Sequence, residues 1–280
     1  MSGTVAIGFF DGVHLGHRAI VAGADVALTF DVHPLSVLAP DRAPRLVMSP
    51  SERLAALEDA GVREVRMLTF DRALAKLDPE DFISRYLGAE TSAVRCGADW
   101  RFGRAGAGDA ETLRRRGISV TVVPYATYAG SPVSSTRIRA ALEAGEITDA
   151  NAMLSRSFTV SGRVFRGKGL GRGLGFPTVN VRPANAEGFV RLPHGVYVVR
   201  AYGRRALANF GLAPTCRERA WTTPTWEIHF PGGDFEPALS VDNAPCIFEL
   251  TDFIRPERAF ASLDELKKQL ESDVEKVLRD

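Results

Sequence analysis

The sequence has few cysteines, no long apolar run and no surplus of either charge. Its three cysteines, Cys96, Cys216 and Cys246, are far apart and form no CxxC pair, which argues against a disulfide framework or a structural zinc site and favours a reducing compartment. No apolar stretch approaches the roughly 20 residues that span a bilayer, and the N-terminus lacks the basic segment of a signal peptide. We therefore expect a cytoplasmic protein with no membrane partner.

Charge and size narrow the class of protein further. Lys and Arg total 35 against 34 Asp and Glu, a net charge of +1, so nothing draws the whole chain to nucleic acid, and an anion site must be local. Hydrophobic residues make up 45% and charged residues 25% of the 280 residues. These values are typical of a globular chain of about two domains.

The first half of the chain alternates strand-like and helix-like segments. Apolar runs predict strands over residues 4–10, 26–30, 62–70, 93–97 and 119–123. Helical patterns fall between them, over residues 18–24, 50–61 and 79–87. Strands separated by helices predict an α/β fold with a parallel, Rossmann-like sheet.

The second half has a different texture. Short strands are predicted over residues 158–165, 195–201, 206–210, 225–230 and 246–253, separated by stretches rich in Gly and Pro. An apolar helical stripe follows over residues 262–278. We therefore expect a small antiparallel β-barrel with a C-terminal helix, and we divide the chain into domains 1–155 and 156–280.

The segment FDGVHLGH lies between a predicted strand and a helix start. Gly16 would let the backbone approach a ligand closely, and the helix N-terminus offers N–H groups to a phosphate. His14 and His17 could then donate hydrogen bonds to phosphate oxygens as charge builds during transfer. Two alternatives remain at this point: a metal site, for which no third ligand lies nearby, and a pair of turn histidines satisfied by backbone.

The segment SSTRIR carries a second set of phosphate-binding candidates. Ser135 and Thr136 can cap a helix that runs to Gly145, and Arg139 would extend from its first turn. The segment alone is weak evidence, because many helices begin in this way. Together with the histidine segment on an α/β sheet, it predicts two helix N-termini that flank one nucleotide triphosphate.

A glycine-rich stretch, GRVFRGKG, opens the predicted barrel. It resembles a P-loop but carries Gly169 where the magnesium-binding hydroxyl belongs, and the glycines that follow form no GxGxxG motif. What remains is a flexible loop with Gly167, Lys168, Gly169 and Arg172, suited to wrapping a polyphosphate.

Directly behind this loop lies GFPTVN, which by itself would be an ordinary turn. Its Thr178 hydroxyl and Asn180 amide could hold magnesium and nucleotide phosphates through oxygen atoms. A basic run through the loop also permits a nucleic-acid-binding barrel, but phosphate binding explains the same charges and few aromatic residues are interleaved for base stacking.

These motifs, in this order, resemble the bacterial bifunctional riboflavin kinase/FMN adenylyltransferase (FAD synthetase) family. The resemblance covers nearly the whole chain. It rests on FDGVHLGH, TFDVHP, CGADWRFG and SSTRIR in the first half and on GKGLGRGLGFPTVN, TWEIHF and FIRPERAFASLDELKKQLESD in the second.

The resemblance implies two reactions and a role for each motif. Riboflavin and ATP would give FMN in the barrel, and FMN and ATP would give FAD and pyrophosphate in the first domain, with Mg²⁺ as cofactor. It implies His14, His17 and Arg139 as catalytic residues of the first domain and Glu227 of TWEIHF as the base of the kinase, although a solvent-facing strand glutamate is the alternative there.

The remaining roles implied by the resemblance are binding roles. ATP and its phosphates would be bound by Gly8, Phe10, Gly16, Ser135, Thr136, Gly167, Lys168, Gly169 and Arg172. The flavin/nucleotide pocket would contain His33, Asp99 and Asn209, with a turn role as the alternative for His33. The metal ligands would be Thr178 and Asn180.

The sequence departs from the family pattern at three points, and two of them, the short stretch after His17 and Ala213, leave an alternative function open. The stretch between His17 and Thr29 is short, Val32 stands where the family has Pro, and Ala213 replaces an expected Arg. None of these changes removes a catalytic side chain. The alternative is that only one activity is live and the other half is a flavin-binding or regulatory module. The sequence does not indicate an oligomeric state.

Overall fold

The computed structural model describes residues 3–167, 170–173, 175–184, 187–212, 224–232 and 241–279, with the side chains of residues 170 and 172 excepted. The chain packs into two units, Met1–Arg139 and Ala140–Asp280. This division falls inside one helix, and the predicted functional division at 155/156 stays a prediction.

The first unit is built on a parallel sheet of five strands in the order β3-β2-β1-β4-β5. The strands are β1 (Gly3–Ile7), β2 (Val26–Phe30), β3 (Glu64–Leu68), β4 (Thr91–Gly97) and β5 (Ser119–Val123). A short hairpin of β6 (Thr127–Tyr128) and β7 (Ser131–Pro132) follows. The predicted parallel α/β sheet is therefore confirmed.

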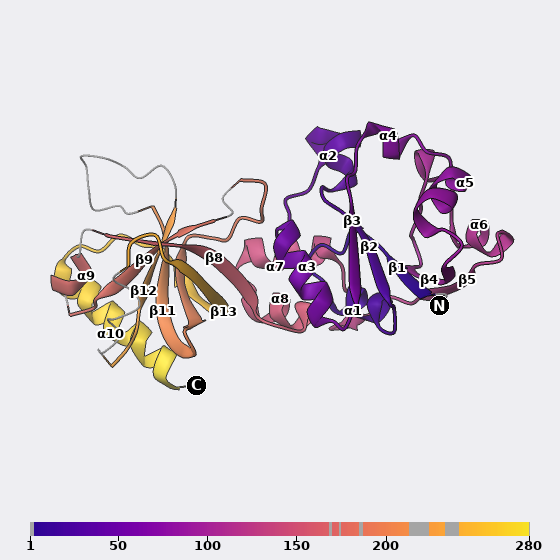
Figure 1. Cartoon of the computed structure of the whole chain (residues 1–280). Helices are drawn as coiled ribbons and strands as arrows, with labels where there is room; N and C mark the ends of the chain where they lie inside the picture. The colour runs from indigo at the N-terminus through magenta and orange to yellow at the C-terminus, as the bar shows by residue number, and fades with distance from the viewer. Residues whose placement is uncertain are drawn as a thin grey trace. The chain divides into compact units, whose positions relative to one another are not determined.

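Helices connect these strands and cover both faces of the sheet (Figure 1). They are α1 (Leu15–Val21), α2 (Pro34–Leu38), α3 (Pro50–Asp59), α4 (Arg72–Ala75), α5 (Pro79–Phe82), α6 (Ala110–Arg115) and α7 (Ser135–Ala144), with 3₁₀ turns η1 (Pro40–Arg42) and η3 (Arg104–Gly106) and the π-helical η2 (Ile83–Leu87). Alternate residues of a strand face opposite sides, so β1 places Val5 and Ile7 against α4, α5, η2 and α6, and Ala6 against α1 and α3.

Local sequence signals explain where these helices begin. Ser49 caps α3 with the expected capping box, because its Oγ accepts the Glu52 N–H (3.2 Å) while Glu52 Oε2 accepts the Ser49 N–H (2.7 Å). The helix buries Leu57, as its spacing predicts, but it also buries Arg53. That arginine reaches the end of a strand, as described below.

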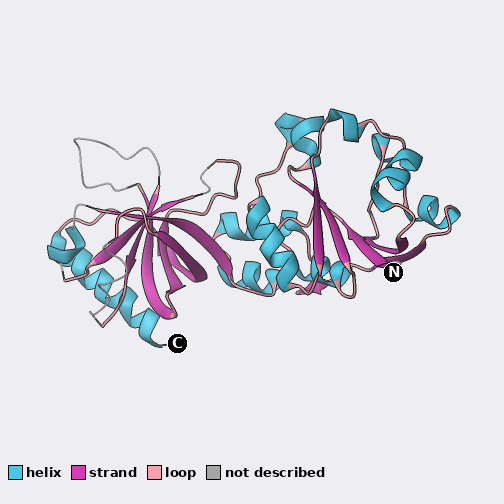
Figure 2. Ribbon diagram, in the orientation of Figure 1, coloured by secondary structure: helices cyan, strands magenta, loops and turns pink. Residues whose placement is uncertain are grey.

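The second unit is a closed antiparallel barrel (Figure 2), and its strands follow the order β10-β11-β12-β9-β8-β13. Its strands are β8 (Phe158–Phe165), β9 (Thr178–Pro183), β10 (Gly195–Ala201), β11 (Arg204–Gly211), β12 (Thr225–His229) and β13 (Pro245–Pro256). Its helices are α8 (Ile147–Leu154), α9 (Leu170–Gly173) and α10 (Leu263–Arg279). The predicted barrel and C-terminal helix are confirmed.

One segment of the barrel differs from its sequence interpretation. The turn expected at GFPTVN ends at Pro177, and Thr178 opens the strand β9. The β-branched residues Thr178, Val179 and Val181 favour the extended backbone, and pairing with both β12 and β8 fixes it.

The C-terminal helix is fixed on the barrel by apolar packing and by one buried ion pair. Val274 and Val277 pack against Val196 and Val198 of β10. Asp273, which is 0% exposed, accepts hydrogen bonds from Nε (2.9 Å) and Nη2 (2.8 Å) of Arg255 on β13. The apolar stripe predicted α10, but it gave no sign of this ion pair.

Candidate functional site

The loop after β1 holds an unusual backbone conformation. Phe10 (φ 59°), Gly12 (φ 87°) and Val13 (φ 40°) all lie at positive φ, which is unfavourable for a β-branched residue such as Val13. The Phe10 ring is buried in the core and lies over Gly8, where a Cβ would come within 2.8 Å of Phe10 Cε1. A phosphate contact from Phe10 would therefore have to come from its backbone.

His14 and His17 lie together at the start of α1. His14 is the N-cap of this helix: its Nδ1 accepts the His17 N–H (3.4 Å), and the two rings stack with centroids 3.6 Å apart. Because Nδ1 accepts, the proton of a neutral His14 ring belongs on Nε2. A Cβ on Gly16 would lie 3.2 Å from His14 Cε1, so glycine lets this ring fold back over the helix start.

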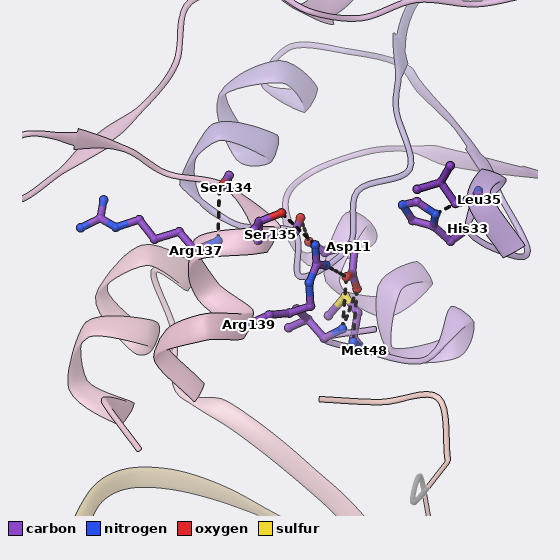
Figure 3. Close-up of polar contacts among 10 residues, drawn as sticks. Asp11, His33, Leu35, Met48, Ser134, Ser135, Arg137 and Arg139 are labelled. Atoms are coloured by element: carbon purple, nitrogen blue, oxygen red, sulfur yellow. Dashed lines mark hydrogen bonds and ion pairs between the residues drawn. The ribbon is translucent and has the colours of Figure 1, made fainter. Parts of the chain in front are cut away.

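The first turn of α7 reaches the same loop from a distant part of the sequence. Ser135 Oγ donates a hydrogen bond to the Asp11 carbonyl (2.8 Å) (Figure 3), and Thr136 Oγ1 accepts one from Arg139 Nη2 (3.0 Å). Ser134 Oγ accepts the Arg137 N–H (3.2 Å). The two helix starts predicted from sequence are therefore adjacent.

Asp11 joins these segments, and its role was missed in the sequence. Its carboxylate, buried with the residue 2% exposed, accepts hydrogen bonds from Arg139 Nη1 (2.9 Å), the Val47 N–H (2.9 Å) and the Met48 N–H (3.4 Å) (Figure 3). Burial raises the pKa of Asp11, while these N–H groups and the charges of Arg139 and Arg53 oppose the rise. The signal in the sequence was the position of Asp11 inside a segment expected to bind phosphate. An acid at such a place needs a cationic partner nearby.

Arg53 is the second residue that sequence reasoning missed. It is fully buried, donates through Nη2 to the Phe30 carbonyl (2.5 Å) at the end of β2, and lies 4.1 Å from the centroid of the Phe9 ring. Within the described part of the chain its Nε and Nη1 have no hydrogen-bond partner. Its place four residues before Leu57, on the apolar face of α3, was the signal that could have identified it.

Two further candidates, His33 and Asp99, follow β2 and β4 and therefore lie at the carboxyl ends of the strands. His33 caps α2 by accepting the Leu35 N–H at Nδ1 (3.1 Å) (Figure 3), and burial, together with the charges of Arg139 and Arg53, lowers its pKa. Asp99 is exposed in the turn after β4, beside Gly97. Ligands of such sheets bind outside the carboxyl ends of the strands, where the strand order reverses, here between β1 and β4.

The barrel arranges its candidates differently, in a row across three neighbouring strands. Glu227 on β12 pairs in register with Asn180 on β9 and with Asn209 on β11. Directly paired residues share one face of a sheet, and all three are half-buried. The neighbours Trp226 and Ile228 point to the opposite face and are buried.

Glu257, just beyond β13, was also missed and lies at the end of this row. Its Oε1 accepts a hydrogen bond from Asn209 Nδ2 (3.3 Å), and His194 Nδ1 is 3.8 Å from its Oε2. A Cβ on Gly211 would overlap the Glu257 carboxylate. Burial raises the pKa of Glu227, and the charge of Glu257 raises it further, which suits a carboxylate that must accept a proton.

Thr178 and Asn180 meet the chemical requirements of a magnesium site. They are two residues apart on β9 and therefore lie on the same face, where they offer a hydroxyl and an amide oxygen. A Cβ on Gly167 would overlap the Asn180 amide, so the backbone of Gly167 passes directly over this residue. Mg²⁺ keeps several waters and phosphate oxygens among its ligands, so two protein oxygens fit the ion.

Some of the predicted site residues lie outside the described part of the chain. Lys168, Gly169 and Ala213 lie outside the described residues, and so does the side chain of Arg172. Within the described ranges, His, Cys, Asp and Glu form no group of three that could hold a metal ion. No helix in those ranges is both long and apolar enough to cross a membrane.

The fold and the two sites define a transferase with two units: a parallel-sheet unit whose histidines and arginine suit phosphate transfer, and a barrel unit with a half-buried carboxylate. The FAD synthetase family model matches residues 2–137, and the riboflavin kinase family model matches residues 154–279. The chain belongs to the bifunctional riboflavin kinase/FMN adenylyltransferase family and carries both of its enzyme domains.

Curated relatives support this assignment along the whole length. The chain is 31% identical to the bifunctional riboflavin kinase/FMN adenylyltransferase of Bacillus subtilis over 98% of this chain and 91% of the relative. It is 34% identical to that of Escherichia coli over 96% and 90%.

A solved structure has the same fold over the whole chain. It is a crystal structure described as a macrolide-efflux protein from Streptococcus pneumoniae, with a TM-score of 0.85 and 27% identity, and the match covers 99% of this chain and 94% of that one. The likeness supports the combination of parallel sheet and barrel described above.

Proposed function

We propose that this chain phosphorylates riboflavin to FMN in the barrel and adenylylates FMN to FAD in the parallel-sheet unit, using one ATP in each step. The observation that carries the proposal is that each unit holds a separate set of chemically suitable groups, one cationic and one carboxylate. The functional division is proposed at 155/156, with an adenylyltransferase domain 1–155 and a kinase domain 156–280.

In the adenylyltransferase step, an FMN phosphate oxygen attacks the α-phosphorus of ATP, and the bond to the β-phosphate oxygen breaks to release pyrophosphate. His14 and His17 donate hydrogen bonds to the phosphate oxygens, where negative charge builds. Arg139, Ser135 and Thr136 hold the pyrophosphate.

Other residues of this unit bind the substrates. The backbone of Gly8, Phe10 and Gly16 lines the phosphate path. His33 and Asp99 contact the flavin or the nucleotide from the ends of β2 and β4. The contacts in support are the hydrogen bonds that join the start of α7 to the loop after β1.

In the kinase step, the terminal ribityl hydroxyl attacks the γ-phosphorus of ATP, its proton passes to Glu227, and ADP leaves. The raised pKa of Glu227 supports this role. Asn209 binds the flavin, and the loop with Gly167, Lys168, Gly169 and Arg172 covers the nucleotide.

Thr178 and Asn180 are the proposed Mg²⁺ ligands, and the bound ion would neutralise charge on the ATP phosphates. We place both reactions in the cytoplasm, because the cysteine usage favours a reducing compartment. The substrates of the proposal are riboflavin, FMN and ATP.

A chromatographic time course of riboflavin with ATP and Mg²⁺ tests the proposal. FMN should appear first and then give way to FAD. FMN without FAD would overturn the adenylyltransferase proposal and direct attention to the short stretch between His17 and Thr29. FAD from supplied FMN, with no product from riboflavin, would overturn the kinase proposal.

A further inference from the structure

We propose that Asp11 is a positioning residue of the adenylyltransferase site, which holds Arg139 in place before ATP arrives. The inference rests on the proposed function, because it assigns Arg139 a phosphate to bind. Asp11 does not touch the substrate in this account; it acts through the guanidinium.

The first argument is that Asp11 contacts α7 twice. Its carbonyl accepts the Ser135 hydroxyl (2.8 Å), and its carboxylate accepts Arg139 Nη1 (2.9 Å). Thr136 accepts the other terminal nitrogen of Arg139 (3.0 Å). The guanidinium is therefore restrained on two sides, by Asp11 from another segment (Figure 3) and by Thr136 from its own helix.

The second argument is that Asp11 is itself fixed. Its carboxylate accepts the N–H groups of Val47 (2.9 Å) and Met48 (3.4 Å), just before α3. The side chains of Arg139 and Asp11 are only 15% and 3% exposed. Charge-assisted bonds that are shielded from water hold their geometry better than exposed ones.

The charges around Asp11 also favour a positioning role for this residue. Both Arg139 and Arg53 act electrostatically on Asp11, and Arg53 is fully buried with few hydrogen-bond partners among the described residues. Without the Asp11 carboxylate, Arg139 would lose the ion pair that holds it, whereas Arg53 would keep the charge of Asp31 nearby. Arg139, the more exposed of the two, would then move away.

The alternative is that Asp11 merely repels phosphate, and the two accounts predict opposite results for Asp11→Asn. The asparagine keeps an oxygen for the backbone N–H groups but removes the charge. If Asp11 only repelled phosphate, FAD formation would be unchanged or faster. If it positions Arg139, kcat/KM for FAD formation should fall about ten- to a hundredfold.

The experiment compares Asp11→Asn, Arg139→Gln and the double variant, with FMN and ATP as substrates. Because Asp11 acts through Arg139, the double variant should be no slower than Arg139→Gln alone. Independent losses that multiply would overturn the inference, and so would an Asp11→Asn variant with wild-type kcat/KM.

Asp25→Asn is the matched control. Asp25 also accepts a backbone N–H, from Thr4 (2.9 Å), and faces an arginine, Arg63 (3.5 Å), but it lies at the amino end of the sheet. This variant should form FAD at the wild-type rate. An equal loss in Asp25→Asn would overturn the inference, because any broken carboxylate contact would then suffice.

A second measurement needs no substitution of Asp11. In the wild-type protein without ATP, ¹⁵N spectra assigned with Arg139→Gln should show slow rotation of the Arg139 guanidinium, and free rotation would overturn the inference. Failure of the proposed function is distinguishable, since the wild-type protein would then form no FAD from FMN at all.

Discussion

The two sites are assembled by different means. In the parallel-sheet unit, side chains join segments that are far apart in sequence, as when Ser135 and Arg139 bind Asp11. In the barrel, Asn180, Glu227 and Asn209 are brought together by backbone pairing of adjacent strands. The first site therefore depends on particular side-chain contacts and the second on strand register.

The two sites also differ in charge. The first gathers Arg139 and Arg53 around one buried carboxylate, Asp11, whereas the second places Glu227 beside a second carboxylate, Glu257. A cationic site suits the binding of pyrophosphate as it leaves, and a carboxylate pair suits the removal of a proton. Changes that affect one reaction and spare the other test this contrast directly.

The largest effect is expected from Glu227→Gln. The substitution keeps the size and removes the base, so riboflavin phosphorylation should fall about 10²- to 10⁴-fold. FAD formation from supplied FMN should keep its wild-type rate, because that reaction belongs to the other unit. Both rates can be followed by chromatography, and an equal fall in both would end the proposed separation.

His14→Ala is expected to give the reciprocal result with a somewhat smaller effect. Loss of one donor to the developing phosphate charge should slow FAD formation about 10²- to 10³-fold, while riboflavin phosphorylation stays at the wild-type rate. A melting curve should accompany the assay, because His14 also caps α1. A slow kinase in a folded His14→Ala protein would contradict the assignment.

A smaller effect is expected from Gly167→Ala, which tests the close approach of Gly167 to Asn180. The added methyl would overlap the Asn180 amide, so the kinase rate should fall about tenfold through displaced groups. Gly173→Ala is the control, since a Cβ there meets no atom of the described residues within 4 Å. Equal rates in the two variants would show that the close approach has no role in the reaction.

The smallest effect is expected from Glu257→Gln, and it appears in the pH profile of the kinase. Glu227 must be ionised to act as a base, so the rate rises with pH through its pKa, which burial and the Glu257 charge raise. Removing the Glu257 charge takes away one of these causes and should move the acidic limb to lower pH. Glu271→Gln, at an exposed position of α10, should leave the acidic limb in place. If Glu257→Gln also left the acidic limb in place, the electrostatic contact between Glu257 and Glu227 would be contradicted.

Elements with a strong local signal were predictable from the sequence. The capping box placed the start of α3 at Ser49, and the apolar run 26–30 matches β2. The turn expected at GFPTVN was partly wrong, since Thr178 opens a strand whose formation depends on β12 and β8 on either side. Local composition carries no information about such pairing.

The same distinction explains which site residues were missed. The motifs singled out His14 and Arg139, but Asp11 gained its importance only when α7 was seen against the loop after β1. Glu257 lies within the segment FIRPERAFASLDELKKQLESD, but that match pointed to the closing helix, and only the barrel brings Glu257 to Asn209. Residues that act through a partner are recognisable only when the partner is known.

The row of Asn180, Glu227 and Asn209 has a further consequence for how the barrel unit can change. Neighbouring strands lie about 4.8 Å apart whatever their side chains. Backbone pairing therefore sets the spacing of the three residues. Repacking the opposite face around Trp226 would leave this strand spacing unaltered. The barrel can therefore diversify its interior over evolutionary time while the spacing of Glu227 and the two asparagines across the strands stays constant.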